Sequence, residues 1–377
     1  MHVVGALVAL SLVASCKSLL GIDDGVVANP QDAGADAVGD ALDDASDGPP
    51  DASLGWWDPT FLYRRAITIN TSALTLPLAN LPVLVRLPSA VVTELAANGA
   101  DARFVADDHV TALPFEIDTS VSNSAHAWVK LSLTTANPRI WLYYGKSAAT
   151  SASSGAMVFD DYESVHHLTD NADASGNGHG GAVQAGATIP AIIDGIIGRA
   201  HMFDGNNDYI ALSNGDDPFD FTTTMSVSAW CRTTGFTVDW QTIVAKGLTS
   251  WRVHRDQNED HLAFGTGAGT LADNVPSSTE IRDGAWHHVF VAHDAVSRRI
   301  YIDGVLEGQG LLFTPTIPTN GSVVRIGAND QVDRPWAGAI DEVRISATTR
   351  SAAWVRAEYV MVTSPTFTTF GPRETSP

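Results

Sequence analysis

The sequence predicts an all-β protein, in which a signal peptide and a disordered tether precede an N-terminal β-sandwich domain and a C-terminal two-sheet jelly roll. Two observations predict this fold class. Short runs alternate apolar and polar residues with a period of two, as in residues 63–69, 127–133 and 226–230, and such runs are typical of half-buried strands. Only 17% of the residues are charged, which suits a β-rich chain with many Ser, Thr, Gly and Asn turn residues.

The formal net charge of −21 limits the classes of partner that the chain can have. A strongly acidic surface repels nucleic acid and anionic lipid head groups, so a nucleic-acid partner is disfavoured. The apolar content of 44% is that of a globular protein, and a chain of 377 residues is long enough for two domains with sizeable cores.

The chain opens with an apolar segment, residues 3–13, which is too short to span a bilayer but suits the central region of an export signal. Val13-Ala14-Ser15-Cys16 follows and resembles the lipobox of bacterial lipoproteins. The resemblance implies that residues 1–15 are a signal peptide and that a lipid on Cys16 is the only attachment to a membrane. Lys17 replaces the aspartate that would retain a lipoprotein at the inner membrane, which implies the outer membrane. A plain cleaved signal with an incidental cysteine is the alternative.

Residues 16–55 form a low-complexity segment of mainly Asp, Ala, Gly, Val and Pro. Between residues 17 and 55 the sequence has nine aspartates and one lysine, and no aromatic residue occurs before Trp56. Self-repulsion and the lack of apolar surface predict a disordered acidic tether.

Residues 56–146 are the predicted N-terminal β-sandwich, with one helical stretch near residues 90–98. Its landmarks are Trp57, Tyr63-Arg64-Arg65, Asp101-Ala102-Arg103-Phe104, Leu113-Pro114-Phe115-Glu116-Ile117-Asp118, Trp128-Val129-Lys130 and Ile140-Trp141-Leu142-Tyr143-Tyr144-Gly145. Together they resemble the bacterial domain family DUF2341, which has no established activity, so the resemblance implies an architecture and little else.

One pair of carboxylates in this domain suggests a catalytic alternative. Glu116 and Asp118 are two residues apart and therefore lie on one face of a predicted strand, as in retaining glycosidases of the laminarinase type. Those enzymes need a further glutamate two or three residues on, where this chain has Ser120 and Val121. A solvated strand is the better interpretation, and no catalytic residue is assigned.

Residues 147–156 are a predicted linker, residues 157–362 the jelly roll and residues 363–377 a C-terminal tail. Asp303-Gly304 predicts a hairpin turn, because both turn positions favour positive φ. Further landmarks are Asp173-Ala174-Ser175-Gly176-Asn177-Gly178, Phe203-Asp204-Gly205, Met225-Ser226-Val227, Trp286-His287-His288, Arg325-Ile326-Gly327 and Gly338-Ala339-Ile340-Asp341-Glu342-Val343. In this order they resemble the LamG-like, concanavalin A-like lectin/glucanase jelly roll.

That resemblance implies one structural calcium ion near the rim of a sheet. Calcium requires six to eight oxygen ligands, and Asp173, Asp204 and Asp341 lie in family motifs that approach one another in such folds. We expect these three carboxylates as ligands, with Asn177 and loop carbonyls completing the shell. The alternative is that each aspartate only caps a turn through backbone N–H groups.

Three tryptophans near loops, Trp240, Trp251 and Trp336, are candidates for stacking on sugar rings, with core packing as the alternative. The paired histidines at 166–167 and 287–288 point to opposite faces of their strands, which disfavours zinc. Cys231 shares a strand face with Val227 and Ala229 and is expected to be a buried, inert thiol.

These features predict a membrane-anchored extracytoplasmic binding or adhesion protein. The LamG-like resemblance implies that its partner is a polysaccharide, another glycan or a surface protein. A secreted glycoside hydrolase and a purely structural envelope protein are the alternatives.

Overall fold

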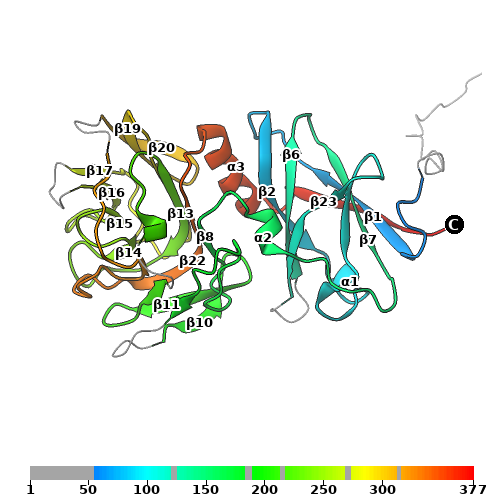
Figure 1. Cartoon of the computed structure of the whole chain (residues 1–377), viewed down its shortest axis with the longest axis horizontal. Helices are drawn as coiled ribbons and strands as arrows, with labels where there is room; N and C mark the ends of the chain where they lie inside the picture. Colours follow the sequence, from blue (N-terminus) through cyan, green and yellow to red (C-terminus); the bar gives the residue numbers. More distant parts are fainter. Residues whose placement is uncertain (1–54, 120–124, 183–188, 213–216, 268–272, 312–315) are drawn as a thin grey trace, which may run out of the picture. The chain divides into compact units, whose positions relative to one another are not determined.

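The computed structural model describes residues 55–119, 125–182, 189–212, 217–267, 273–311 and 316–377. The expected signal peptide, the lipidation site Cys16 and all but the last residue of the expected tether lie outside these residues. Residues Ser53–Pro377 form one compact unit. The described residues build two β-sandwiches, which confirms the predicted all-β fold class (Figure 1).

The first sandwich pairs a five-stranded sheet, ordered β23-β1-β7-β3-β4, with a three-stranded sheet, ordered β2-β6-β5. Its strands in chain order are β1 (Tyr63–Ile69), β2 (Leu78–Leu87), β3 (Arg103–Ala106), β4 (Ala112–Leu113), β5 (Phe115–Asp118), β6 (Ala125–Leu133), β7 (Arg139–Tyr144) and β23 (Thr368–Thr375). Two short helical turns, α1 (Ser89–Val92) and η1 (Ala97–Gly99), occupy the predicted helical stretch.

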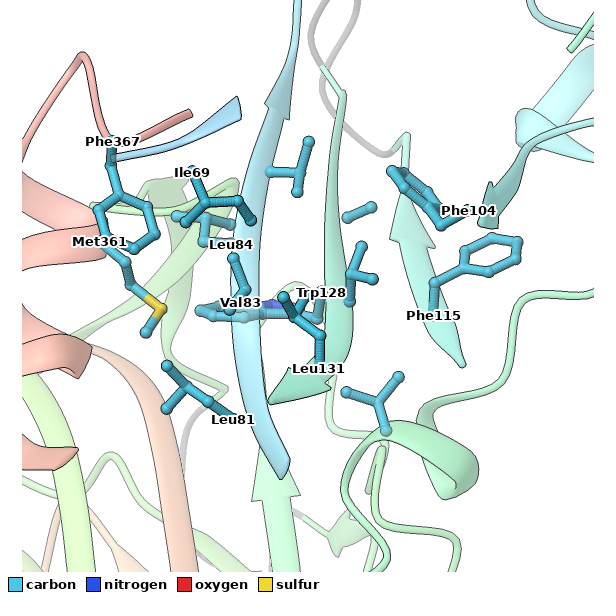
Figure 2. Packing of buried hydrophobic residues seen from close by; sticks show 14 of the residues in the cluster. Ile69, Leu81, Val83, Leu84, Phe104, Phe115, Trp128, Leu131, Met361 and Phe367 are labelled. Carbon is cyan, nitrogen blue, oxygen red and sulfur yellow. The ribbon is translucent and has the colours of Figure 1, made fainter. Parts of the chain in front are cut away.

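The three-stranded sheet is covered on both faces, which explains why β2 is a nearly continuous apolar run. Val83 and Val129 are paired across β2 and β6 and face the other sheet, whereas the neighbouring pair Leu84 and Trp128 faces the opposite way. Figure 2 shows this strand pair with Met361, a residue from the far end of the sequence, in the same buried cluster.

The segment expected as a C-terminal tail is instead part of the first sandwich. Residues 368–375 form β23, which pairs antiparallel with β1 from Tyr63↔Thr375 to Ile69↔Thr368 (Figure 1, red beside blue). The reason is a non-local pairing. One edge of β1 pairs with β7, and without β23 the backbone N–H and C=O groups along its other edge would have no strand to pair with. The jelly roll is therefore inserted in the chain between β7 and β23 of the first sandwich.

Helix α3 (Ala352–Thr363) leads the chain back from the jelly roll to β23. Ser351 caps it, because its side chain accepts a hydrogen bond from the Trp354 N–H. At the other end Arg86 donates to the carbonyl oxygens of Met361 (3.2 Å) and Val362 (2.8 Å), so a cation satisfies the end of the helix.

The jelly roll consists of two sheets that enclose a second apolar core. The eight-stranded sheet has the order β10-β11-β22-β13-β18-β19-β20, with β8 also paired to β22, and the seven-stranded sheet has the order β17-β16-β15-β14-β21-β12-β9. The strands are β8 (Ser164–His166), β9 (Gly181–Ala182), β10 (Ala191–Asp194), β11 (Arg199–Asp204), β12 (Ile210–Leu212), β13 (Met225–Arg232), β14 (Thr242–Ala245), β15 (Trp251–Arg255), β16 (Leu262–Thr266), β17 (Asn274–Pro276), β18 (His287–His293), β19 (Ser297–Ile302), β20 (Val305–Leu311), β21 (Arg325–Ile326) and β22 (Ala337–Ser346).

The predicted hairpin is confirmed between β19 and β20, where Asp303 and Gly304 have φ of 52° and 76°. Strand β22 carries a β-bulge, since its register against β13 shifts between Ser228 and Trp230, and Glu342 adopts a left-handed φ of 49°. The bulge interrupts the alternation of side chains along β22. Ile340, Val343 and Ile345 belong to the jelly-roll core, whereas the two consecutive residues Asp341 and Glu342 do not.

The expected linker is hydrogen-bonded to the first sandwich. Ser154 donates its N–H to the Phe115 carbonyl, and the Ser153 hydroxyl accepts from the Ile117 N–H. A one-turn helix, α2 (Gly155–Val158), follows directly and contacts β5 and β6. Within the described part of the chain, no helix has the length and the apolar character needed to cross a membrane.

Candidate functional site

A cleft lies where the outer face of the three-stranded sheet meets the jelly roll, and we call it the junction cleft. Its volume is about 290 Å³. It is lined by residues from β5, β6 and the segment after β8, namely Glu116, Ile117, Asp118, His126, Trp128, His167, Thr169, Asp170, Ala172, Asp173 and Ala174.

The strand register explains why polar side chains gather there. Glu116 is paired with Trp128 and Asp118 with His126 across β5 and β6, and directly opposed residues of an antiparallel pair share a face. The alternation that places Phe115 in the core therefore turns both carboxylates outward. The predicted common face of Glu116 and Asp118 is confirmed, although the side chains face the jelly roll and not open solvent.

His167 connects the two sandwiches at the back of the cleft. Its Nδ1 donates to Oε1 of Glu342 on β22 (2.8 Å), and its Nε2 donates to Oε2 of Glu116 on β5 (3.0 Å). Because an ionised carboxylate only accepts hydrogen bonds, both ring nitrogens must carry a proton, and His167 is an imidazolium. Burial alone would lower the pKa of His167, but Glu342 and Glu116 outweigh it and raise the pKa to about 10.

An aromatic ring lies beside the chain of ion pairs that Glu342, His167 and Glu116 form. The Trp128 ring lies nearly parallel to that of His167, with an interplanar angle of 11° and centroids 6.2 Å apart. The Arg344 guanidinium lies 4.2 Å from the Trp128 centroid, which is a cation–π distance. Arg344 also donates to Glu342 (2.9 Å), so the bulged strand β22 contributes both charges that hold the back wall.

The remaining polar groups of the cleft come from both sides of the junction. The Thr169 hydroxyl donates to Oδ2 of Asp118 (3.2 Å), and His126 Nε2 lies 3.9 Å from the same oxygen. Burial lowers the pKa of His126, with Asp118 opposing the shift, so this imidazole is neutral at physiological pH. Asp170 is exposed at the cleft and accepts from the Ala172 N–H.

The structure does not bring the three expected calcium ligands together. Asp173 accepts from the N–H groups of Val165, Ser175 and His179 and from the Ser175 hydroxyl. Asp204 accepts from the N–H groups of Asn206 and Asn207 at a turn. Asp173 and Asp204 thus act as turn caps, the alternative considered for them, and Asp173 also lines the junction cleft.

Asp341 is fully buried in a different network. Its Oδ2 accepts from the N–H groups of Ile196 and Ile197, and burial, reinforced by neighbouring Glu342, raises its pKa well above the usual range. Among the residues that the structure describes, no group of three or more His, Cys, Asp or Glu side chains could hold a metal ion. The expected shared ligand set of the three aspartates was therefore wrong.

Two of the three predicted stacking tryptophans are in the jelly-roll core. Trp251 and Trp336 are 0% exposed and belong to its apolar cluster, so neither can reach a sugar. Trp240 is half-buried beside His254, with the Arg334 guanidinium 5.8 Å from its centroid, and remains accessible. Cys231 is a buried free thiol as predicted, and burial raises its pKa.

Sequence reasoning missed His167, Trp128, Glu342 and Arg344 as members of one site. The available signal was two charged residues, Glu342 and Arg344, in a strand whose other residues are mainly apolar. Charged side chains on a strand beside a core mean that its outer face meets water or compensating charges. Nothing in the sequence indicates which segment supplies the compensating charges.

Two family models match the chain. Laminin_G_3, described as the concanavalin A-like lectin/glucanases superfamily, matches residues 204–356, and the domain of unknown function DUF2341 matches residues 98–174. No curated protein sequence matches this chain.

Several solved structures resemble part of the chain. Domain 4 of an extracellular GH43 arabinanase from Geobacillus stearothermophilus, in complex with arabinotriose, is 25% identical, with a TM-score of 0.43 over 52% of this chain and 97% of that chain. The binding domain of Paraclostridial Mosquitocidal Protein 1 is 14% identical, with a TM-score of 0.43 over 53% and 52% of the two chains. The botulinum neurotoxin serotype G binding domain is 16% identical, with a TM-score of 0.42 over 54% and 51%. The match thus spans about half of each toxin chain.

The fold and the two family matches together establish that this chain carries a DUF2341 domain followed by a concanavalin A-like lectin/glucanase domain.

Proposed function

We propose that this chain is a binding protein that works outside the cytoplasm, anchored in the outer membrane by a lipid on Cys16, and that it recognises a carbohydrate in the junction cleft. The match to the concanavalin A-like lectin/glucanase superfamily supports a carbohydrate partner. The lipobox-like Val13-Ala14-Ser15-Cys16 supports the anchor.

The observation that carries the proposal is the polar lining of the cleft. Asp118, Asp170, His126 and Thr169 all line one hollow, so carboxylate, imidazole and hydroxyl groups occur together there. Sugar hydroxyls donate and accept hydrogen bonds in close succession, and such a set of side chains can satisfy both roles. A volume of about 290 Å³ is close to the lower end of small-ligand pockets, which begins at about 300 Å³. The cleft would therefore take one sugar unit of a chain.

A glycan array probed with the full chain and with an Asp118→Asn variant tests the proposal. We expect binding to a restricted set of glycans and at least about a tenfold loss in the variant, because an amide cannot replace an ionised acceptor. Asp239→Asn is the matched control, since Asp239 is an exposed side chain of the jelly roll that does not line the cleft.

Different outcomes separate the alternatives. Binding to no glycan would overturn the carbohydrate proposal. Glycan binding that is lost in Trp240→Ala but kept in Asp118→Asn would move the site to the half-buried Trp240. Release of reducing sugar that disappears in Glu116→Gln would favour the hydrolase. Mass analysis of the protein extracted from membranes tests the anchor, and an unmodified Cys16 would refute it.

A further inference from the structure

A small cavity, which we call the buried cavity, lies where the first sandwich, the jelly roll and helix α3 meet. Its volume is about 10 Å³, and Trp128 lines both this cavity and the junction cleft. The walls are formed by Trp128, Ser228, Trp230, His288, Glu342, Arg344, Glu358, Met361 and Val362. None of these residues is more than 6% exposed, so the cavity is shielded from bulk solvent.

Four residues of this lining each have a buried polar atom that lacks a hydrogen-bond partner among the residues that the structure describes. These atoms are Nε1 of Trp128, Nδ1 of His288, Nε of Arg344 and Oε2 of Glu358. Trp128 and Arg344 offer N–H donors, Glu358 offers an acceptor, and the role of His288 depends on its tautomer. A buried donor or acceptor that stays unpaired is costly, because it has given up its hydrogen bonds to water. The lining of the buried cavity therefore requires a polar occupant.

The carboxylate of Glu358 is the acceptor that most needs this occupant. Its Oε1 accepts from Nε1 of Trp354 (3.0 Å), whereas its Oε2 lies 3.6 Å from Nε2 of His288, which is beyond hydrogen-bond distance. Burial alone would raise the pKa of Glu358, but His288 and Arg344 outweigh it and lower the pKa. The carboxylate is therefore ionised, and Oε2 requires a donor.

The size of the buried cavity and the chemistry of its walls limit what the occupant can be. One water molecule requires a volume of about 10–15 Å³, so the cavity has room for one water and for no larger ligand. A molecule in so small a space contacts the lining on every side. An ammonium ion has a similar size but only donates hydrogen bonds, whereas the N–H groups of Trp128 and Arg344 need an acceptor. Water both donates and accepts, and it therefore matches this lining.

We propose that the buried cavity binds one structural water molecule, which donates to Oε2 of Glu358 and accepts from the N–H of Trp128 or Arg344. The water then bridges α3 to β6 or β22, and so joins elements of both sandwiches to the helix between them. It also extends the chain of ion pairs that runs from His167 through Glu342 to Arg344. This inference is independent of the proposed carbohydrate binding.

A crystal structure of the full chain, at a resolution that shows ordered water, tests the site directly. We expect one water peak in the buried cavity, within about 3.2 Å of Oε2 of Glu358 and of a side-chain nitrogen of Trp128 or Arg344. An empty cavity, or a peak that does not contact Oε2 of Glu358, would overturn the proposal. This test uses the unaltered protein and does not depend on the folding of any variant.

Substitution of Ser228, which lines the buried cavity from β13, tests the site in solution. Ser228→Val adds a methyl group to the space of the water, whereas the matched control Ser228→Ala leaves that space open. Oxygen-17 relaxation dispersion counts the long-lived internal waters of the full chain. We expect one water fewer in Ser228→Val than in Ser228→Ala, and a melting temperature lower by about 3 °C or more, because a methyl group cannot replace the hydrogen bonds of the water.

The two readouts together separate water from an empty cavity. A methyl group that fills an empty cavity would leave the water count unchanged and would keep or raise the melting temperature, which would overturn the proposal. A lower melting temperature with an unchanged water count would show overpacking alone, and would overturn it as well.

Discussion

The pKa values of two neighbouring carboxyl groups, Asp341 and Glu342, are shifted in opposite directions because their side chains meet different partners. Burial, reinforced by Glu342, raises the pKa of Asp341, which accepts hydrogen bonds from the backbone N–H groups of Ile196 and Ile197. Burial acts on Glu342 in the same direction, but His167 and Arg344 overcome it and lower its pKa. At the bulge, the Glu342 carboxylate contacts both cations, so backbone geometry sets the opposite directions of the two pKa shifts.

At the residue scale, His167→Gln should destabilise the protein by about 2–4 kcal/mol, because it leaves the buried carboxylate of Glu342 with Arg344 alone. The free energy of unfolding in urea, followed by tryptophan fluorescence, measures the effect. His261→Gln is the control, since His261 lies 3.9 Å from Asp256 and should change the stability by no more than about 0.5 kcal/mol. Equal effects of the two substitutions would contradict the role of His167.

The same ion-pair chain predicts a pH dependence of stability. The pKa of His167 is raised from 6.5 to about 10 in the folded state. Its contribution is therefore complete below pH 6.5 and is lost as the pH rises toward about 10. Melting temperatures measured across this window should fall, and the fall should be smaller in His167→Gln. Parallel curves for both proteins would show that other groups cause the alkaline loss.

At the scale of elements, the β19–β20 hairpin depends on the left-handed backbone of its turn and on the space beside it. A Cβ at Gly304 would lie 3.1 Å from Cβ of Tyr359 and 3.3 Å from Cα of Arg356 on α3. The turn thus approaches the helix so closely that only glycine fits without displacement. The same helix packs Val355 against Phe290 and Tyr301 of the eight-stranded sheet.

Gly304→Ala should therefore lower the free energy of unfolding by about 1–2 kcal/mol, through backbone strain and contact with α3. Gly235→Ala is the matched control, because a Cβ there meets nothing within 4 Å and its φ is not left-handed. Chemical denaturation of both variants gives the comparison. An unchanged stability of Gly304→Ala would mean that the turn and helix adjust at no cost.

At the scale of the whole molecule, the two sandwiches are joined by chain order as well as by packing. The first sandwich is complete only when β23 has paired with β1, and the jelly roll lies between these two strands in the sequence. Aromatic and apolar side chains of α3, such as Trp354 and Met361, belong to the same buried cluster as β2 and β6. The buried cluster of the first sandwich therefore includes residues that follow the jelly roll in the sequence.

A chain that ends at Thr366 should lose the pairing of β1 with β23 and melt at a clearly lower temperature, by at least about 5 °C. A chain that ends at Thr375 keeps β23 and loses only the contacts of Ser376, such as its N–H donation to the Leu62 carbonyl. Differential scanning calorimetry of the two truncated chains and the full chain tests this. Coincident transitions would show that β23 adds little to the fold.

Local pattern was sufficient for several features of this protein. Period-two alternation predicted the strands and the common face of Glu116 and Asp118. It also predicted that Cys231 is buried. All three follow because the backbone of a strand fixes the direction of each side chain. Asp303-Gly304 predicted its hairpin for the same kind of reason, since positive φ is a property of the turn residues.

The tertiary structure decided what each face meets. Alternation groups residues on a face but does not say whether solvent, a second sheet or a helix covers it, so Trp251 and Trp336 were expected at loops and lie in the core. The pairing of β23 with β1 and the meeting of His167 with Glu116 and Glu342 join residues that are far apart in the sequence. Such contacts depend on how the sheets close and pack, which no local run of residues encodes.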